Sequence, residues 1–229
     1  MVDYFDTIRE NLGDFEQYAQ ANWTKWGRAR NDGLIPKDEW IASETVKLAW
    51  RDRHPKIRQF WYACKDAAVS AICNSGKAFK VGKHIVFKAL NYKGFNYLLV
   101  RMPSGNFLVY FNPKYNPDTK SLSYWGVDSM ATGGAFAKWQ QVHTYGGKLV
   151  ENLCQSCARD VLSYNMPLAE ERGYEIILTV HDELVTETPD SAEFTHEDLS
   201  AIIATNPPWA EGLPLAAAGY EAKRYKKDD

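Results

Sequence analysis

Hydrophobic spacing changes twice along the chain. Apolar residues recur at helical spacing from residue 36 to residue 73. Pro36 suits the first position of a helix. His54-Pro55 breaks this pattern, so two consecutive helices are expected. Alternation of apolar residues then indicates a β region with four strands. The expected strands cover residues 85–90, 97–102, 107–112 and 121–127.

The second half of the chain returns to helix before one more pair of strands. A helix is expected from about Lys148 to about Tyr164, with a kink or interruption at Pro167. Residues 174–188 read as a β-hairpin, and residues 194–205 as a final helix. The expected fold class is therefore α+β, with an antiparallel sheet packed with helices.

One helix carries a clear core-facing stripe. Its apolar positions recur at 3.6-residue spacing, which predicts that they lie on one buried face. These positions are Ile57, Phe60, Trp61, Cys64, Ala67, Ala68 and Ala71.

Composition constrains the function only loosely. The 229 residues are 45% hydrophobic with a net charge of −2, so a sizeable core can form and bulk charge does not favour nucleic-acid binding. Any such surface must come from local clusters or from a partner. There is no signal peptide or long apolar segment, which predicts a cytoplasmic protein without a membrane partner. Cys154 and Cys157 form a C-x-x-C pair, expected to be two buried apolar residues because no second ligand pair completes a zinc site.

The hairpin turn is the strongest candidate for chemistry. His181, Asp182 and Glu183 lie between two strands that are apolar enough to be expected to be buried. Two adjacent carboxylates with apolar strands behind them repel one another and lose hydration, which costs free energy. A hard divalent cation such as Mg²⁺ relieves that cost because it prefers carboxylate oxygen. The plain alternative is an acidic, solvated loop.

Several blocks in order along the chain resemble one enzyme family. From about residue 36 to the end, the chain is similar to the C-terminal part of family A DNA polymerases, in particular the bacteriophage-type relatives of DNA polymerase I. The blocks are W-R-D-R-H-P-K-I-R-Q-F-W (50–61), M-P-S-G-N-F-L-V-Y (102–110), T-Y-G-G-K-L-V-E-N-L-C-Q-S-C-A-R-D-V-L (144–162), V-H-D-E-L-V-T-E-T-P (180–189), P-P-W-A-E-G-L-P-L (207–215) and R-Y-K-K (224–227).

The resemblance assigns roles to the turn and to the helix before it. It implies that Asp182 holds catalytic Mg²⁺, that Glu183 assists beside it, and that His181 approaches the primer terminus. Gln155 matches a residue that reads the DNA minor groove near the nascent base pair. Arg159 lies one helical turn further on, where an ion pair with a neighbouring carboxylate and a DNA contact are both open.

The start of this helix is a further candidate DNA contact. Tyr145-Gly146-Gly147-Lys148 could bring backbone close to DNA and place Lys148 on a phosphate. The alternative is a helix that simply begins after a flexible turn.

Other parts expected of the family are missing from this sequence. These are a second metal-binding aspartate and the fingers helix that grips the incoming triphosphate. The resemblance therefore implies a two-metal Mg²⁺ site completed by an aspartate outside this chain. The expected partners are primer-template DNA, a dNTP and a second chain carrying the N-terminal palm, the fingers and the thumb. Residues 1–60 would form a helical region after the fingers, and residues 61–229 the palm part. If the gene belongs to a phage, the compartment is the host cytoplasm.

Two other functions remain open. One is a non-catalytic DNA-binding accessory protein that has kept a polymerase fold, although the retained Asp182-Glu183 pair argues against that hypothesis. The other is an unrelated metal-dependent hydrolase that uses His181 with the two acids. Such an enzyme needs further ligands, and the other four histidines show no paired ligand spacing.

Overall fold

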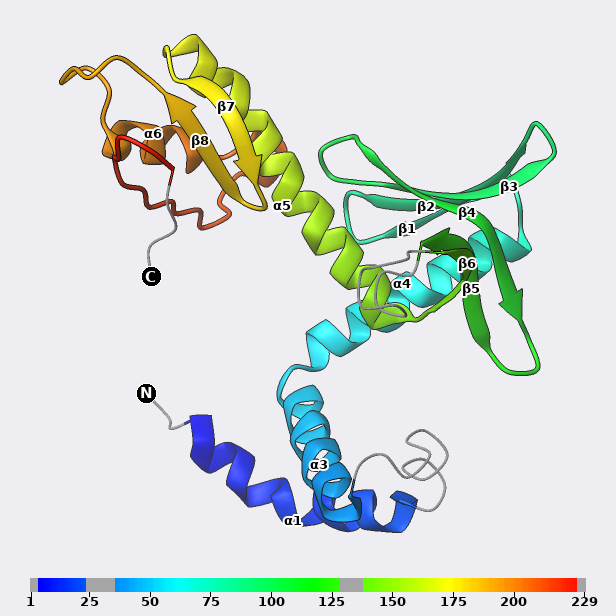
Figure 1. Ribbon diagram of the computed structural model, residues 1–229. Helices are drawn as coiled ribbons and strands as arrows, with labels where there is room; N and C mark the ends of the chain where they lie inside the picture. The colour runs from blue at the N-terminus through cyan, green and yellow to red at the C-terminus, as the bar shows by residue number, and fades with distance from the viewer. Residues whose placement is uncertain (1–3, 24–35, 128–137, 226–229) are drawn as a thin grey trace. The chain divides into compact units, whose positions relative to one another are not determined.

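A computed structural model of the protein describes residues 4–23, 36–127 and 138–225. The chain divides between Tyr62 and Ala63 into two compact units (Figure 1). The helices are α1 (Tyr4–Asn22), α3 (Lys37–Arg53), α4 (Pro55–Cys73), α5 (Gly146–Glu171), α6 (His196–Ile203) and the short 3₁₀ helix η2 (Pro208–Ala210). The strands are β1 (Ala78–Val81), β2 (Ile85–Tyr92), β3 (Phe95–Arg101), β4 (Phe107–Asn116), β5 (Ser121–Val127), β6 (Trp139–Thr144), β7 (Glu175–Val180) and β8 (Glu183–Glu187).

The first unit is built on the packing of α1 against α3. Ala19, Trp40 and Ile41 form its buried cluster, and Trp23 packs against it with its ring centroid 5.4 Å from that of Trp40. Pro36 is the residue before the helix rather than its first residue, with an extended ψ of 147°. The two helices predicted between residues 36 and 73 are confirmed as α3 and α4.

The predicted stripe of α4 is buried along its C-terminal half only. Cys64, Ala67, Ala68 and Ala71 are buried, as the helical spacing predicts. Ile57, at the start of the stripe, is instead 39% exposed. The stripe is therefore a core face from Cys64 onward.

The second unit contains a six-stranded antiparallel sheet in simple sequence order, β1 to β6. The four predicted strands are confirmed as β2 to β5. The pattern missed two others: β1 has only four residues, and four of the six residues of β6 are polar. The two missed strands lie at the ends of the sheet order, where a strand has one neighbour and needs less apolar surface.

One face of this sheet forms the core of the second unit. Strand residues on this face, such as Phe87, Leu98 and Leu122, are almost fully buried. Leu149 and Leu153 of α5 are buried as well, and Asn152 of α5 donates a 3.0 Å hydrogen bond to the Tyr110 hydroxyl on β4.

The helix α5 is longer than predicted. It begins at Gly146, two residues before the expected start, and continues through Pro167 to Glu171. Proline removes one helical hydrogen bond, but Pro167 and Ser163, whose carbonyl loses its donor, are both exposed. Water can satisfy that carbonyl, while the buried Ala169 holds the last turn in place.

The predicted hairpin is confirmed as the separate two-stranded sheet β7–β8, but its predicted burial is wrong. Ile177 and Leu178 are 56% and 48% exposed. With two strands and no second layer over this face in the described part of the chain, the apolar side chains stay in contact with solvent.

The last helix is anchored through its ends. Thr195 is the residue before α6, and its side chain accepts a hydrogen bond from the Asp198 backbone N–H. At the other end, the buried Asn165 donates hydrogen bonds of 2.7 and 3.1 Å to the carbonyls of Ile203 and Thr205. The architecture is thus α+β, as predicted, and none of the described helices has the length and apolar character to span a membrane.

Candidate active site

His181 and Asp182 form the tight turn of the β7–β8 hairpin. Val180 and Glu183 are the pair that closes it. His181 has a φ of +56°, the left-handed conformation that glycine usually supplies at the first position of such a turn. A non-glycine residue in this conformation destabilises the fold. Such strained conformations occur often at functional sites, where the position of the side chain matters.

The two carboxylates of the turn have different environments. Asp182 is exposed, whereas Glu183 is half-buried at the start of β8. The hydroxyl of Tyr225 donates a 3.4 Å hydrogen bond to Glu183 Oε2. Loss of hydration and, after it, the negative charge of Glu183 raise the pKa of Tyr225.

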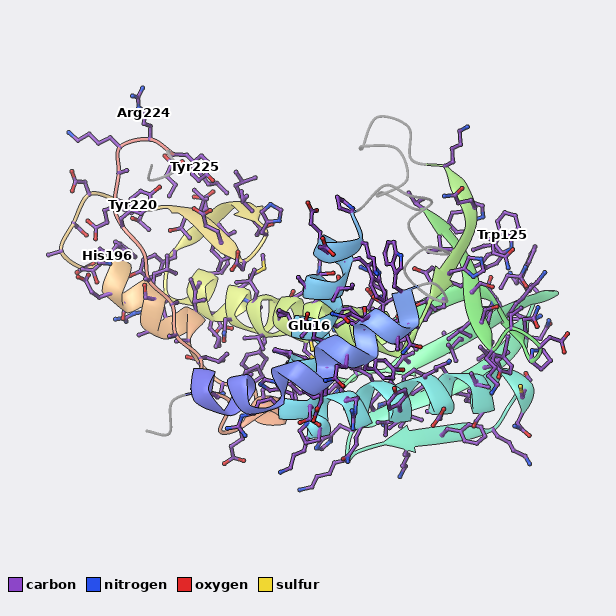
Figure 2. The ribbon with its side chains drawn as sticks, turned by 90° about the horizontal axis from the view of Figure 1, so that it is seen from below. Glu16, Trp125, His196, Tyr220, Arg224 and Tyr225 are labelled. Atoms are coloured by element: carbon purple, nitrogen blue, oxygen red, sulfur yellow. The ribbon has the colours of Figure 1, made fainter. Side chains whose placement is uncertain are left out.

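Tyr225 is a neighbour of the turn that the sequence interpretation missed. It belongs to the R-Y-K-K block, and Figure 2 labels it on the C-terminal segment beside the hairpin. The sequence signal that could have identified it is its position as the one aromatic residue in the basic R-Y-K-K block.

The exposure of Asp182 changes the argument that the turn binds a divalent cation. Because Asp182 is in contact with water, the expected desolvation of two buried acids does not apply to it. Two adjacent carboxylates on a rigid hairpin remain, and their oxygens are ligands that Mg²⁺ prefers. The carboxylate oxygens of the pair are suitable ligands for a hard cation. Two side chains cannot fill the six positions of an octahedral shell, so other groups must supply the remaining ligands.

The other predicted site residues line the exposed side of α5. Gln155 and Arg159 are exposed and lie one helical turn apart. Lys148 is half-buried about two turns before Gln155 and donates a 2.8 Å hydrogen bond to Glu151. Tyr145 precedes the helix and is also exposed.

Two carboxylates that could pair with Arg159 have other partners. Asp160 accepts hydrogen bonds from Ser104 and Asn106 in the turn between β3 and β4, and Glu151 accepts from Lys148. This arrangement leaves the Arg159 side chain projecting from an exposed helix face.

The hairpin and α5 are neighbours, as the short connection between them predicts. Gly173 turns the chain with a φ of +98°, and β7 packs against α5 (Figure 1). The backbone N–H of Ile176 donates a 2.8 Å hydrogen bond to the Glu170 side chain, which fixes the start of β7 to the end of the helix.

Among the described residues, His196, Glu197 and Glu221 are the one group of three metal-type ligands whose atoms lie within 4.8 Å of one another, and His181, Asp182 and Glu183 do not form such a group. Figure 2 labels His196 of this group. Glu221 accepts a hydrogen bond from the His196 backbone, and the His196 ring lies 3.2 Å from Glu197. These groups therefore already have partners within the protein.

The C-x-x-C pair does not behave as predicted. Cys154 is exposed and Cys157 half-buried, because both lie beside the buried positions of α5 rather than on them. The pKa of the Cys157 thiol is raised, mainly by burial and to a smaller extent by the nearby negative charge of Asp160.

The geometry defines an α+β protein with an acidic hairpin turn packed beside a long helix whose exposed side is polar. Comparison with known proteins adds a relationship. The chain is 37% identical over 202 residues to a protein named "DNA polymerase" from Bacillus phage SP02, and is thus related to a phage DNA polymerase. The matched region is 87% of this chain but 29% of that relative, so the chain spans less than a third of its length. No family model matches the chain, and no solved structure matches it.

Proposed function

We propose that this chain is part of a family A DNA-directed DNA polymerase and contributes the turn that binds the catalytic metal. The observation that supports it most is the 37% identity to the SP02 phage protein across most of this chain. Asp182 and Glu183 on the hairpin turn supply the residue types that such chemistry needs. The reaction is transfer of a nucleotide from a dNTP to a primer 3′-hydroxyl.

In this proposal each residue has a separate task. Asp182 and Glu183 would hold Mg²⁺, which when bound neutralises charge on the reacting phosphates. His181 would lie beside the primer terminus. Gln155 and Arg159, exposed on α5, would contact the DNA minor groove and backbone. Lys148 and Tyr145 would contact the backbone near the start of α5.

The proposal requires protein beyond this chain. Two carboxylates do not complete a two-metal site, so a further aspartate and the dNTP-binding fingers helix would come from a second polypeptide that also carries the thumb. Exposed Ile177 and Leu178 on β7 offer an apolar surface against which that polypeptide would pack.

Primer extension with Mg²⁺ and dNTPs tests the proposal. The chain is assayed alone and as the complex that co-purifies with it from its source. We expect extension by the complex, and we expect Asp182→Asn to reduce it by at least about a thousandfold, because metal-bound charge supplies several kcal/mol of transition-state stabilisation.

A matched variant controls for general charge effects. Asp190→Asn removes an exposed carboxylate just beyond β8 and should leave extension unchanged. Near-normal extension by Asp182→Asn would remove the metal-binding role. DNA binding without extension in any preparation would favour the non-catalytic accessory protein instead.

A further inference from the structure

The face of the six-stranded sheet opposite the core is rich in aromatic side chains. Tyr97, Phe111 and Trp125 are directly paired across β3, β4 and β5, so they share this face. Positions two residues away along the strands point the same way. The resulting outer sheet face carries seven aromatic residues: Tyr92, Phe95, Tyr97, Phe107, Phe111, Trp125 and Trp139.

These rings form a connected surface that is open to solvent. The Phe111 ring centroid lies 5.4 Å from that of Phe95, 5.5 Å from that of Tyr97 and 5.9 Å from that of Trp139. Phe95 and Trp139 are 54% and 57% exposed, and Phe107 is similarly exposed. A continuous exposed aromatic surface of this kind usually marks a binding site. Figure 2 draws these side chains as sticks and labels Trp125 among them.

Positive charge is interleaved with the rings. Lys80 and Arg101 both pair with Val86, and Lys88 pairs with Leu99, which places all three cations on the outer sheet face. All three are exposed. Residues 67–117, which include β1 to β4, contain seven Lys and Arg and no Asp or Glu, although the whole chain has a net charge of −2. This local excess was the sequence signal for the surface, and bulk composition hides it.

One end of the same face is hollowed and polar. The hollow has a volume of about 460 Å³ and lies where β4, β5 and β6 meet. Lys114, Gln141 and His143 line it, and Gln141 donates a 2.8 Å hydrogen bond to the Ser123 hydroxyl. Asp118 is the acidic residue among its lining. Amide, hydroxyl and imidazole groups here suit hydrogen bonding to the edge of a base.

We propose that the outer sheet face binds single-stranded DNA, with bases stacked on the aromatic rings and phosphates held by the Lys and Arg side chains. Open sheets that combine these two residue types are suited to unpaired strands, because only unpaired bases expose their flat faces. A second copy or an apolar protein partner would instead bury several cations without counter-charge, which is costly.

This surface is separate from the hairpin turn and goes beyond the proposed function. Only the choice of DNA over RNA rests on that function. A polymerase that handles a template has an unpaired strand ahead of the primer, and this face would hold such a strand by contacts that do not depend on sequence.

The test is binding of a fluorescein-labelled oligothymidylate to the full chain, measured by fluorescence anisotropy in EDTA without dNTP. We expect Phe95→Ala and Trp139→Ala each to weaken binding about tenfold, as loss of one stacked base does. Tyr62→Ala removes an exposed aromatic residue from α4, outside the sheet, and should leave binding unchanged.

Salt dependence tests the cations separately. Lys88→Gln should lower the slope of log affinity against log salt by about 0.7, the value for one phosphate contact on a single strand. Lys56→Gln, an exposed cation on α4, should leave the slope unchanged. Lys88 is exposed, so this variant tests the surface even if an aromatic variant folds poorly.

Several results would overturn the proposal. They are absence of oligothymidylate binding at low salt, unchanged binding in both aromatic variants, or tighter binding of oligouridylate. Self-association that Trp139→Ala abolishes, without DNA affinity, would make the face a contact between copies. Nucleotide incorporation is not measured here, so failure of the polymerase proposal would leave this result intact.

Discussion

The thiol of Cys64 shows how burial sets chemistry at a single residue. Its side chain is fully buried on α4, and desolvation, followed by the nearby Cys154, raises its pKa from 9.0 to about 12. A folded-state pKa above the unfolded value means that the folded protein holds this proton more tightly. The corresponding stabilisation is complete below about pH 9 and is lost as the pH rises toward about 12.

We therefore expect the melting temperature to fall above pH 9, and to fall less steeply in Cys64→Ala. Scanning calorimetry of both proteins between pH 8 and about 12 measures the difference. Burial also raises the pKa of Tyr110 to about 12, so part of the decline should remain in the variant. Parallel curves for the two proteins would contradict the assignment to Cys64.

At the turn, residue types could be predicted but their environment could not. The apolar runs around His181 and Asp182 correctly indicated two strands joined by a tight turn. Burial depends on whether another layer covers the hairpin, and local sequence does not contain that information. The left-handed backbone of His181 was equally hidden, because turn geometry is normally predicted from glycine or asparagine.

Among the elements, strong periodicity was predictive and weak periodicity was not. The strands β2 to β5 alternate or are continuously apolar, and the structure confirms them. Pro167 suggested an interruption that α5 does not have. The one hydrogen bond that proline removes lies on the exposed side of the helix, where water can replace it. Tertiary contacts at Asn165 and Ala169 determine the last turns of that helix.

Asp160 connects two elements that are far apart in sequence. It joins α5 to the turn between β3 and β4 by accepting hydrogen bonds from Ser104 and Asn106. We expect Asp160→Ala to lower the free energy of unfolding by about 2 kcal/mol, since hydrogen bonds to charged groups contribute more than neutral ones. Urea unfolding followed by circular dichroism gives this value.

The control is Glu171→Ala, which removes an exposed carboxylate at the end of the same helix. Its effect should stay within about 0.5 kcal/mol, as for most surface substitutions. An equally small effect of Asp160→Ala would mean that the turn is held to α5 by packing alone.

Across the whole molecule, charge is distributed unevenly. A net charge of −2 and a pI near 6.2 indicated no affinity for polyanions, yet the stretch from residue 67 to 117 has no acidic residue. We expect the chain to bind a heparin column at neutral pH despite its net negative charge, and to elute earlier when Lys88 and Arg101 are both changed to Gln. Flow-through of the unmodified chain at low salt would show that the positive region is too weak to act at a distance.

The acid-free stretch also has a kinetic consequence. Opposite charges gathered in different parts of one molecule give it a permanent electric dipole, and a dipole in the field of a polyanion experiences a torque. A nucleic acid strand approaching within about one Debye length would rotate the protein until β1 to β4 face it, before any side chain makes contact. This rotation would bring the outer sheet face into contact with the nucleic acid first. The hairpin turn that carries Asp182 would contact the nucleic acid afterwards.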